Sequence, residues 1–483
     1  MRRWTTLTLL AVLLAMSMGT PAPVAAAGGS SRRVNVTYFS GEVDWASTAI
    51  FWFGRIDRLQ AGPPGRNYVD VRLAYTAEGL ALFANVADYY TWFDTAATTA
   101  TDLTGWDAIA IYLDTDGDAG SAPQTDDYRF ISGLCVNNCG EGTYLRSARG
   151  NGSGWDTSWA PEWDAGTYAV WSDGGPNNNS VGMDYGWHTY MYLPWSALGR
   201  SGPPGQGEVW GLAVTLYDRD ALPPAGAVAP QSWPVAAGGT SPATWGELHF
   251  GAASYNLRPV AADGTVTIRR GLGASVVEDA WVGGGGTCGG GHEGNPDSDN
   301  HGSDTSLYVE NQELIADFPC FSRSYLRFGL DDIPAGKIII SATLTLHHWG
   351  GASSSAQPSY IQVFRADDGW EEDTVAWNTG PLAQENLPGT WVQTAISAPT
   401  WPYDAYTWDV SKAVGAAYVA GEPVTLALYS ADTDFHSSKY LTSSEAGDWN
   451  AAGRPTLTVT YGHLTDIPRD HQVFLPLALR GLP

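Results

Sequence analysis

Basic residues are scarce in this sequence. Its 483 residues include 25 Lys and Arg against 51 Asp and Glu, which gives a net charge of −26 at pH 7. A charge of this sign and size repels nucleic acid and anionic membrane surfaces, so we expect neither as a partner. It favours a neutral ligand over a polyanion, unless calcium bridges the two.

Long apolar runs are also scarce, and only the start of the chain has one. Residues 1–27 combine two early arginines, an apolar run from Leu7 to Met16 and small residues at the end. This is the pattern of a secretory signal peptide. No later run reaches the roughly 18 apolar residues that a membrane helix needs. We therefore expect an exported, extracellular protein without a membrane span, soluble or held at the cell surface. Nothing in the sequence indicates an oligomeric state.

Cysteines are few, and none lies in a Cys/His cluster with the spacing of metal ligands. In an oxidising compartment the four cysteines favour disulfides over a metal site. Cys135 and Cys139 enclose three residues and could close a small loop, and Cys288 and Cys320 would then pair in the second half. Four cysteines allow three connectivities, so other pairings stay open.

Long helical periodicity is absent, and short runs of alternating polarity take its place. Period-two alternation with β-branched and aromatic residues predicts half-buried strands, and clusters of Gly, Pro, Asn and Asp separate them. The runs are 69–76, 80–88, 108–114, 189–195, 209–218, 324–330, 338–349, 360–366, 424–430 and 454–461. We predict an all-β protein, with two jelly-roll-like β-sandwich domains in tandem.

The boundary between the domains is expected where a strand ending at Phe250 gives way to small and polar residues. We predict a first domain at 34–251, a second at 263–462 and a C-terminal tail at 463–483. The tail is interpreted as an export or surface-retention signal that folding does not need. The alternative is a final strand packed across the second domain.

Two stretches of the first domain carry a resemblance to a known family. Leu80–Asp88 is an apolar predicted strand that ends in Val-x-Asp. Trp106–Asp114 begins with Trp-Asp, continues as a predicted strand and ends in Asp. Residues 232–250 then supply Ser-Trp, a polar loop and an aromatic-Gly-x-Leu ending. Over about 38–250 the chain resembles carbohydrate-binding module family 9 and the DOMON-like β-sandwiches.

The resemblance implies a sugar clamp made of two indoles, since an indole offers a flat surface to the apolar face of a pyranose. Trp106 lies near the position of the first indole, but the loop before Trp245 has no aromatic residue for the second. Trp92 and Trp155 are the alternative platform. For each tryptophan the competing interpretation is packing inside the sandwich.

Alternating carboxylates follow the predicted strand 108–114. Asp114, Asp116 and Asp118 flank a glycine, and Asp127 could add a ligand from the next strand. Oxygen ligands of this kind suit a structural Ca²⁺, which takes six to eight of them. The alternative is a turn stabilised by the aspartates themselves.

The second domain carries a sharper resemblance, because several motifs follow one another in order over about 200 residues. The motifs are Gly302/Leu307/Val309, Tyr325–Phe328, Ile333-Pro334, Ala342–Leu346, Trp370–Asn378 and Arg454–Tyr461. Together they resemble the DNRLRE domain, which is also classed as carbohydrate-binding module family 96.

One of these motifs, GWEEDTVAWN, could also be read as a catalytic centre, because glycosidases use a pair of carboxylates. Adjacent Glu371 and Glu372 would point to opposite faces of an extended chain, which does not suit such a pair. We expect Glu372 to cap backbone amides or to pair with an arginine such as Arg327. Trp370 and Trp377 are expected to pack the sandwich.

Ligand contacts in the second domain are expected from side chains that should be exposed. The candidates are Arg323, Trp349 and Lys439, with Arg327, Lys337, His347 and His348 beside them. Basic groups on an acidic protein would suit a polymer of uronic acids.

Three functions remain open at this point. The first is a secreted carbohydrate-binding protein that recognises extracellular polysaccharide through its β-sandwich modules. The second is a glycan-active hydrolase or lyase with an unrecognised site, although two accessory sandwiches leave no span for a catalytic domain. The third is a non-catalytic structural or adhesive protein of the cell surface.

Overall fold

The computed structural model describes residues 32–55, 67–136, 139–140, 142–170, 178–179, 184, 186–255, 260–283, 299–312, 320–351, 357–398, 400–433 and 437–465. The signal peptide predicted at 1–27, Cys288 and the tail after Thr465 lie outside these residues. No helix within the described ranges is long and apolar enough to cross a membrane.

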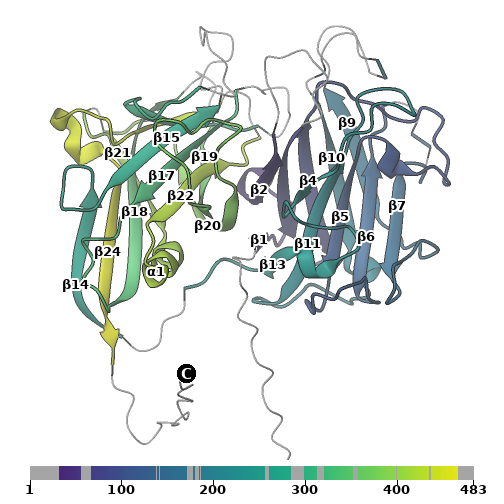
Figure 1. Cartoon of the computed structure of the whole chain (residues 1–483), viewed down its shortest axis with the longest axis horizontal. Helices are drawn as coiled ribbons and strands as arrows, with labels where there is room; N and C mark the ends of the chain where they lie inside the picture. Colours follow the sequence, from purple (N-terminus) through teal and green to yellow (C-terminus); the bar gives the residue numbers. More distant parts are fainter. Residues whose placement is uncertain are drawn as a thin grey trace, which may run out of the picture. The chain divides into compact units, whose positions relative to one another are not determined.

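The first half of the chain forms two sheets that share one apolar core (Figure 1). Its strands are β1 (Arg33–Tyr38), β2 (Ala49–Gly54), β3 (Tyr68–Tyr75), β4 (Gly79–Ala87), β5 (Ala108–Asp114), β6 (Asp127–Gly133), β7 (Leu145–Gly150), β8 (Trp155–Asp156), β9 (Asp164–Val170), β10 (Gly186–Pro194), β11 (Val209–Tyr217), β12 (Gln231–Trp233) and β13 (Gly246–Phe250). One sheet runs β2-β3-β4-β10-β9, and the other runs β1-β13-β11-β5-β6-β7-β8, with β12 on β11.

Alternation along the strands builds this core. Val69, Val71 and Leu73 of β3 are buried in it, as are Ile109 and Ile111 of β5 in the opposite sheet. Since successive side chains of a strand point to opposite faces, one face of each sheet supplies the core. The predicted β-sandwich is confirmed.

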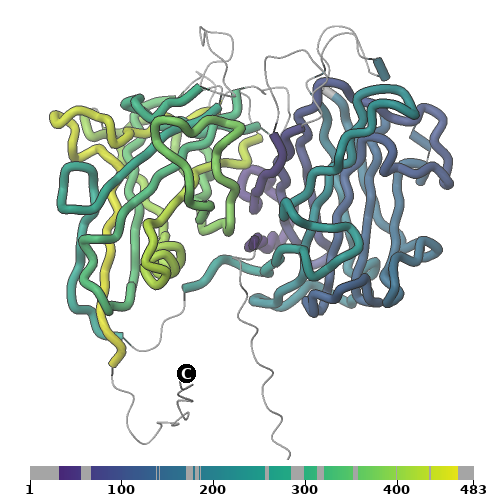
Figure 2. Tube along the Cα trace, viewed as in Figure 1, coloured from purple at the N-terminus to yellow at the C-terminus, as the bar shows by residue number. Residues whose placement is uncertain are grey.

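The second half repeats the two-sheet arrangement with a core of its own. Its strands are β14 (Val260–Arg269), β15 (Val277–Gly283), β16 (Ser306–Val309), β17 (Ser322–Phe328), β18 (Ile338–Gly351), β19 (Ser359–Ala366), β20 (Ala383–Val392), β21 (Asp404–Asp409), β22 (Val424–Ser430), β23 (Lys439–Thr442) and β24 (Thr456–Leu464). One sheet runs β15-β17-β22-β19-β20, and the other runs β14-β24-β18-β23-β16, with β21 on β18. The first and last strands, β14 and β24, lie side by side (Figure 2).

A helix, α1 (Ser411–Ala420), was not predicted from the sequence. It is short and rich in small residues, and it packs Ala413, Val414 and Ala417 into the core of the second half. Gly415 faces the Tyr255 side chain, where a Cβ would collide with the ring. Short 3-10 turns complete the structure at Trp45–Ser47, Leu103–Gly105, Trp195–Leu198, Pro242–Thr244 and Asp448–Gly453.

A third apolar cluster joins the two halves. It brings Trp52 and Tyr68 of the first half against Phe364 and Tyr429 of the second, and the Trp52 and Phe364 ring centroids lie 5.0 Å apart. Polar contacts accompany it, because the Arg72 guanidinium donates to the carbonyl oxygen of Gln312 at 2.9 Å. The outer face of β3 is therefore buried too.

Candidate functional site

The GWEEDTVAWN segment is a turn rather than the extended chain assumed from the sequence. The backbone N–H groups of Thr374 and Val375 both donate to the carbonyl oxygen of Glu371. Trp370 and Trp377 are buried, which confirms their expected role in packing.

The two glutamates of this segment have separate partners. Glu372 Oε1 accepts the backbone N–H of Asp279 at 2.8 Å, so the amide-capping alternative is confirmed. Arg327 instead donates to Glu278 at 2.5 Å and lies 3.7 Å from Glu371. Burial raises the pKa of Glu372, and the Asp279 N–H lowers it. Glu372 is thus occupied in structural contacts, with Arg270 Nη1 also 3.8 Å away, whereas the Glu371 side chain is exposed.

The expectation that the basic residues of the second half are exposed is wrong for Arg323 and Lys439. Both side chains are buried. The Lys439 ammonium donates to the carbonyl oxygens of Gln357 and Ser437, at 2.7 and 2.6 Å. His347 and His348 are buried as well, contrary to the same expectation, and burial lowers the pKa of His348 to about 4. A polymer at the surface cannot reach these groups.

Arg323 lies among aromatic rings of both halves. Its guanidinium carbon is 3.9 Å from the ring centroid of Trp377 and 4.6 Å from that of Trp52, and Nη1 donates to the Tyr68 hydroxyl at 3.2 Å. Cation–π attraction is strongest when the charge is desolvated, as it is here. The residue therefore joins the two halves.

Trp349 is half-buried and is the sequence candidate that lies beside exposed aromatic rings. At the end of β18 it joins Trp401, Tyr403 and Trp449, and we call these four residues the outer aromatic patch. The ring centroid of Trp401 lies 4.9 Å from that of Trp449, 4.5 Å from that of Tyr403 and 6.3 Å from that of Trp349. Trp449 is 69% exposed and Trp401 is 41% exposed.

The patch continues inward as a row of packed rings. Trp349 contacts Tyr440, which contacts Tyr308, with centroid separations of 5.5 and 4.5 Å. Tyr308 then packs on the buried Trp281, 4.5 Å away. These contacts fix the base of the patch, so its exposed rings lie on a rigid support. The sequence analysis did not select Trp401 or Trp449. The pattern that could have identified them is a tryptophan next to proline or aspartate in a polar loop.

The tryptophan candidates of the first half are more enclosed. Trp92 is buried and cannot serve as a platform, contrary to expectation. Trp106 is half-buried under the guanidinium of Arg219, 5.5 Å from its ring centroid. Trp155 is half-buried beneath Arg129, and its indole N–H donates to the carbonyl oxygen of Gly239 at 2.8 Å. The structure does not bring these three indoles together.

The aspartate loop after β5 is a tight turn. Asp114 accepts the backbone N–H groups of Gly117 and Ala119, at 2.7 and 3.0 Å, and Asp116 accepts that of Asp118. Asp127 also lies here, and Asp127 Oδ1 is buried without a hydrogen bond. Burial is the main cause that raises its pKa to about 7.

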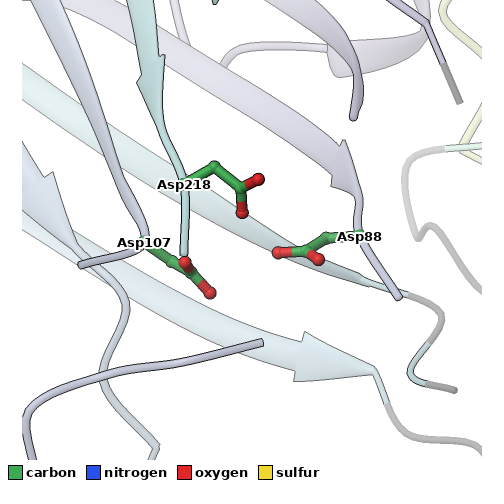
Figure 3. Close-up of side chains that lie close together, drawn as sticks. All are labelled: Asp88, Asp107 and Asp218. Atoms are coloured by element: carbon green, nitrogen blue, oxygen red, sulfur yellow. The ribbon is translucent and has the colours of Figure 1, made fainter. Parts of the chain in front are cut away.

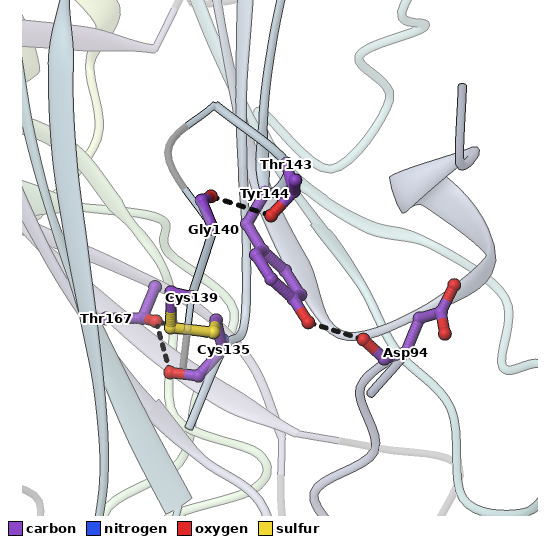
Figure 4. Close-up of a disulfide and its surroundings, with 7 residues drawn as sticks. All are labelled: Asp94, Cys135, Cys139, Gly140, Thr143, Tyr144 and Thr167. Carbon is purple, nitrogen blue, oxygen red and sulfur yellow. Dashed lines mark hydrogen bonds between the residues drawn. A yellow bond between two sulfur atoms is a disulfide. The ribbon is translucent and has the colours of Figure 1, made fainter. Parts of the chain in front are cut away.

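Cys135 and Cys139 form the predicted disulfide (Figure 4). Thr167 holds one end, because its hydroxyl donates to the Cys135 carbonyl oxygen and accepts the Cys135 N–H, each at 3.0 Å. Cys320 is also disulfide-bonded, while its predicted partner lies outside the described residues.

Residues 275–461 match the model of carbohydrate-binding module family 96, which confirms the resemblance drawn from the motifs of the second half. Similar solved structures include a carbohydrate binding module family 9 (CBM9) from Caldicellulosiruptor kristjanssonii, in complex with cellotriose and, separately, with glucose. They are 16% and 17% identical to this chain, with TM-scores of 0.30 and 0.29. Each alignment covers 47% of this chain and 100% of the solved one. No curated protein matches the chain.

Proposed function

We propose that this chain is a secreted carbohydrate-binding protein that recognises extracellular polysaccharide, and that the outer aromatic patch is its sugar-contacting surface. The observation that carries the proposal is the exposure of Trp401 and Trp449 on a rigid aromatic base, within a region that matches a carbohydrate-binding family.

The chemistry of the patch suits a sugar ring. An indole exposed at this level leaves apolar surface in water, and clustered exposed apolar surface on a soluble protein marks an interaction site. The axial C–H groups of a pyranose cover such a ring while its hydroxyls stay in water. The rings need no ordering on binding, since their neighbours already hold them, and this lowers the entropic cost.

The charge around the patch favours a neutral polysaccharide. Asp448 is exposed next to Trp449 and pairs with Arg454, with Nη2 to Oδ1 at 2.8 Å. Asp404, which follows Tyr403 in the sequence, adds a second carboxylate, and this one already accepts hydrogen bonds from the N–H and hydroxyl of Ser397 and the N–H of Ala398. Carboxylates accept hydrogen bonds from sugar hydroxyls but repel a polyuronate.

Among the basic residues expected to bind uronic acids, Arg323, His347, His348 and Lys439 are buried. Arg327 and Lys337 are only partly exposed and pair with Glu278 and Asp263, so that alternative loses support.

Affinity electrophoresis of the full chain tests this function. Gels containing neutral glucans, mannans or xylans should retard the protein, and gels containing a polyuronate should not. Release of reducing ends from any of these polymers, abolished in Glu372→Gln, would favour the hydrolase alternative. Migration unaffected by every polymer would favour a structural or adhesive role.

A structural Ca²⁺ at Asp114, Asp116, Asp118 and Asp127 remains part of the proposal. The unpaired Asp127 Oδ1 supports it, while the backbone N–H groups that Asp114 accepts support the alternative of a self-sufficient turn. A melting curve that shifts upward with calcium in wild type but not in Asp116→Asn would favour the ion.

A further inference from the structure

A pocket of about 390 Å³ lies where the two halves of the chain meet, and we call it the junction pocket. The first half contributes Trp52 of β2 and Gln231 of β12 to its wall. The second half contributes Arg323 of β17 and Trp377 of the loop between β19 and β20. Ligand pockets of about 300–1,000 Å³ occur preferentially at domain interfaces, with aromatic walls and a few polar groups. The junction pocket has this size, place and lining.

The charge of the junction pocket is opposite to that of the protein. The whole chain has 51 acidic and 25 basic residues, yet the described residues that line the pocket include two arginines and no aspartate or glutamate. Arg323 is buried, whereas Arg55 and Val235 are exposed. The pocket therefore has one positive charge inside and a second at its opening, which favours an anionic ligand.

The buried charge of Arg323 has no carboxylate partner in the part of the chain that the structure describes. Its guanidinium contacts the rings of Trp377 and Trp52 and donates to the hydroxyl of Tyr68. Asp70 is close enough for Arg323 to lower its pKa, but the Asp70 carboxylate pairs with Arg72, with Nη1 to Oδ1 at 2.9 Å. Buried charges are ordinarily paired, so the pocket beside Arg323 offers a place for the missing anion.

Other donors in the wall of the pocket also lack an acceptor. The indole N–H of Trp52, Nε2 of Gln231 and Nε of Arg323 are each buried without a hydrogen bond. Buried polar groups without a partner are uncommon in folded proteins and call for an explanation. All three groups are donors, so the partner that they lack is one that offers oxygen atoms.

We propose that the junction pocket binds a small organic carboxylate with a flat or apolar body, about the size of benzoate. The planar guanidinium of Arg323 matches the geometry of a carboxylate, and the indoles of Trp52 and Trp377 supply an apolar wall for the rest of the molecule. A pocket of this volume admits one small molecule and not a polymer. The proposal is therefore independent of polysaccharide binding at the outer aromatic patch.

The competing explanation is a water-filled crevice between two imperfectly matched surfaces, with Arg323 stabilised by its aromatic neighbours alone. The two explanations differ in how the pocket treats charge. A crevice has no preference between a carboxylate and a neutral molecule of the same shape, whereas a site built around an arginine prefers the carboxylate.

Isothermal titration of the full chain with benzoate and with benzamide decides between them, because the two probes share a shape and differ in charge. We expect benzoate to bind one site per chain, with a Kd at least about tenfold lower than that of benzamide, since hydrogen bonds to charged groups are the stronger ones. Inorganic phosphate should bind more weakly than benzoate, because it offers no apolar surface to the indoles. Equal Kd values for benzoate and benzamide, or no heat of binding with millimolar benzoate, would overturn the proposal.

The variant that locates the site is Arg323→Met, which removes the charge and keeps most of the side-chain volume. We expect it to lose the preference for benzoate over benzamide. The matched control is Arg200→Ala, which removes an arginine that also lies over an indole, that of Trp210, but does not line the pocket. This control should bind benzoate as wild type does.

A second variant keeps the test decisive if Arg323→Met folds poorly. Val235 is 69% exposed, so Val235→Trp should fold normally while it narrows the opening of the pocket. It should raise the Kd of benzoate at least about tenfold, whereas Trp401→Ala/Trp449→Ala in the outer aromatic patch should leave that Kd unchanged. Wild-type affinity for benzoate in both Arg323→Met and Val235→Trp would overturn the proposal.

Discussion

Arg72 offers the sharpest test of how the structure is held together. Its guanidinium lies in a fully buried pair with Asp70, with Nη1 to Oδ1 at 2.9 Å. It also donates to the backbone carbonyl oxygens of Gln312 and Ala431 in the second half, at 2.9 and 3.3 Å. Arg72→Ala would leave a carboxylate and two carbonyl groups buried without these partners.

The expected cost of this substitution follows from the burial. Breaking a buried ion pair by removing one partner costs about 3–5 kcal/mol, because the remaining charge stays desolvated. The control is Arg200→Ala, which breaks a pair with Glu208 at 2.7 Å whose two side chains are each 30% exposed. Water solvates the remaining group there, so the cost should be about 1 kcal/mol or less.

The loss in Arg72→Ala should also depend on pH. Burial raises the pKa of Asp70 to about 6, and Arg72 is the largest of the effects that lower it. Without Arg72 the pKa of Asp70 in the folded state rises further above its value in the unfolded chain. Around neutral pH the folded state of the variant therefore binds more protons than its unfolded state. The free energy of unfolding of the variant should therefore fall as pH rises, and the loss should be larger at pH 8 than at pH 5.

Urea unfolding at pH 5 and pH 8 measures these free energies of unfolding. The proteins compared are wild type, Arg72→Ala, Arg200→Ala and the double variant Asp70→Asn/Arg72→Met. The double variant replaces both partners and should lose less free energy of unfolding than Arg72→Ala. Equal losses in Arg72→Ala and Arg200→Ala, at either pH, would refute the reasoning, since burial would then have no consequence.

Two further predictions concern a carboxyl group and a disulfide. Burial raises the pKa of Asp279 to about 7, so the folded state binds more protons between 3.8 and that value, and the stability of wild type should fall as pH rises through this window. Thermal melts across the window should show a shallower fall in Asp279→Asn, and an unchanged slope would count against the assignment. Cys139→Ser opens a loop of only a few residues and should cost about 2 kcal/mol of stability. Chemical denaturation checks this, with Thr143→Ala in the turn that follows the bridge as the control. A loss above about 4 kcal/mol would mean that the bridge supports more than its own loop.

The strands were largely predictable from the sequence, and β3 shows both why and where prediction ends. Its alternation placed Val69, Val71 and Leu73 on a core face, as observed. The same alternation makes Asp70 and Arg72 read as a solvent face, yet both are buried against the second half. A polar interface with paired charges has the residue pattern of a surface, so the sequence of one strand cannot distinguish the two.

The candidate site was only partly predictable. Trp349 was found because it ends a predicted strand, whereas Trp401 and Trp449 come from loops that converge only in the folded chain. Arg323 and Lys439 were expected at the surface because basic residues seldom lie in cores, and aromatic rings and carbonyl oxygens explain their burial. Asp88, Asp107 and Asp218, whose buried carboxylates lie close together (Figure 3), were not grouped by the sequence analysis because they are far apart in sequence.

The central claim is that the outer aromatic patch binds a neutral polysaccharide, and one titration tests it most directly. Isothermal titration with whichever neutral glycan retards the wild type would compare Trp401→Ala/Trp449→Ala with Trp391→Ala, whose indole is 40% exposed but lies outside the patch. The account predicts at least about a tenfold rise in Kd for the double variant, equivalent to about 1.4 kcal/mol, and an unchanged Kd for Trp391→Ala. Wild-type affinity in the double variant would contradict it.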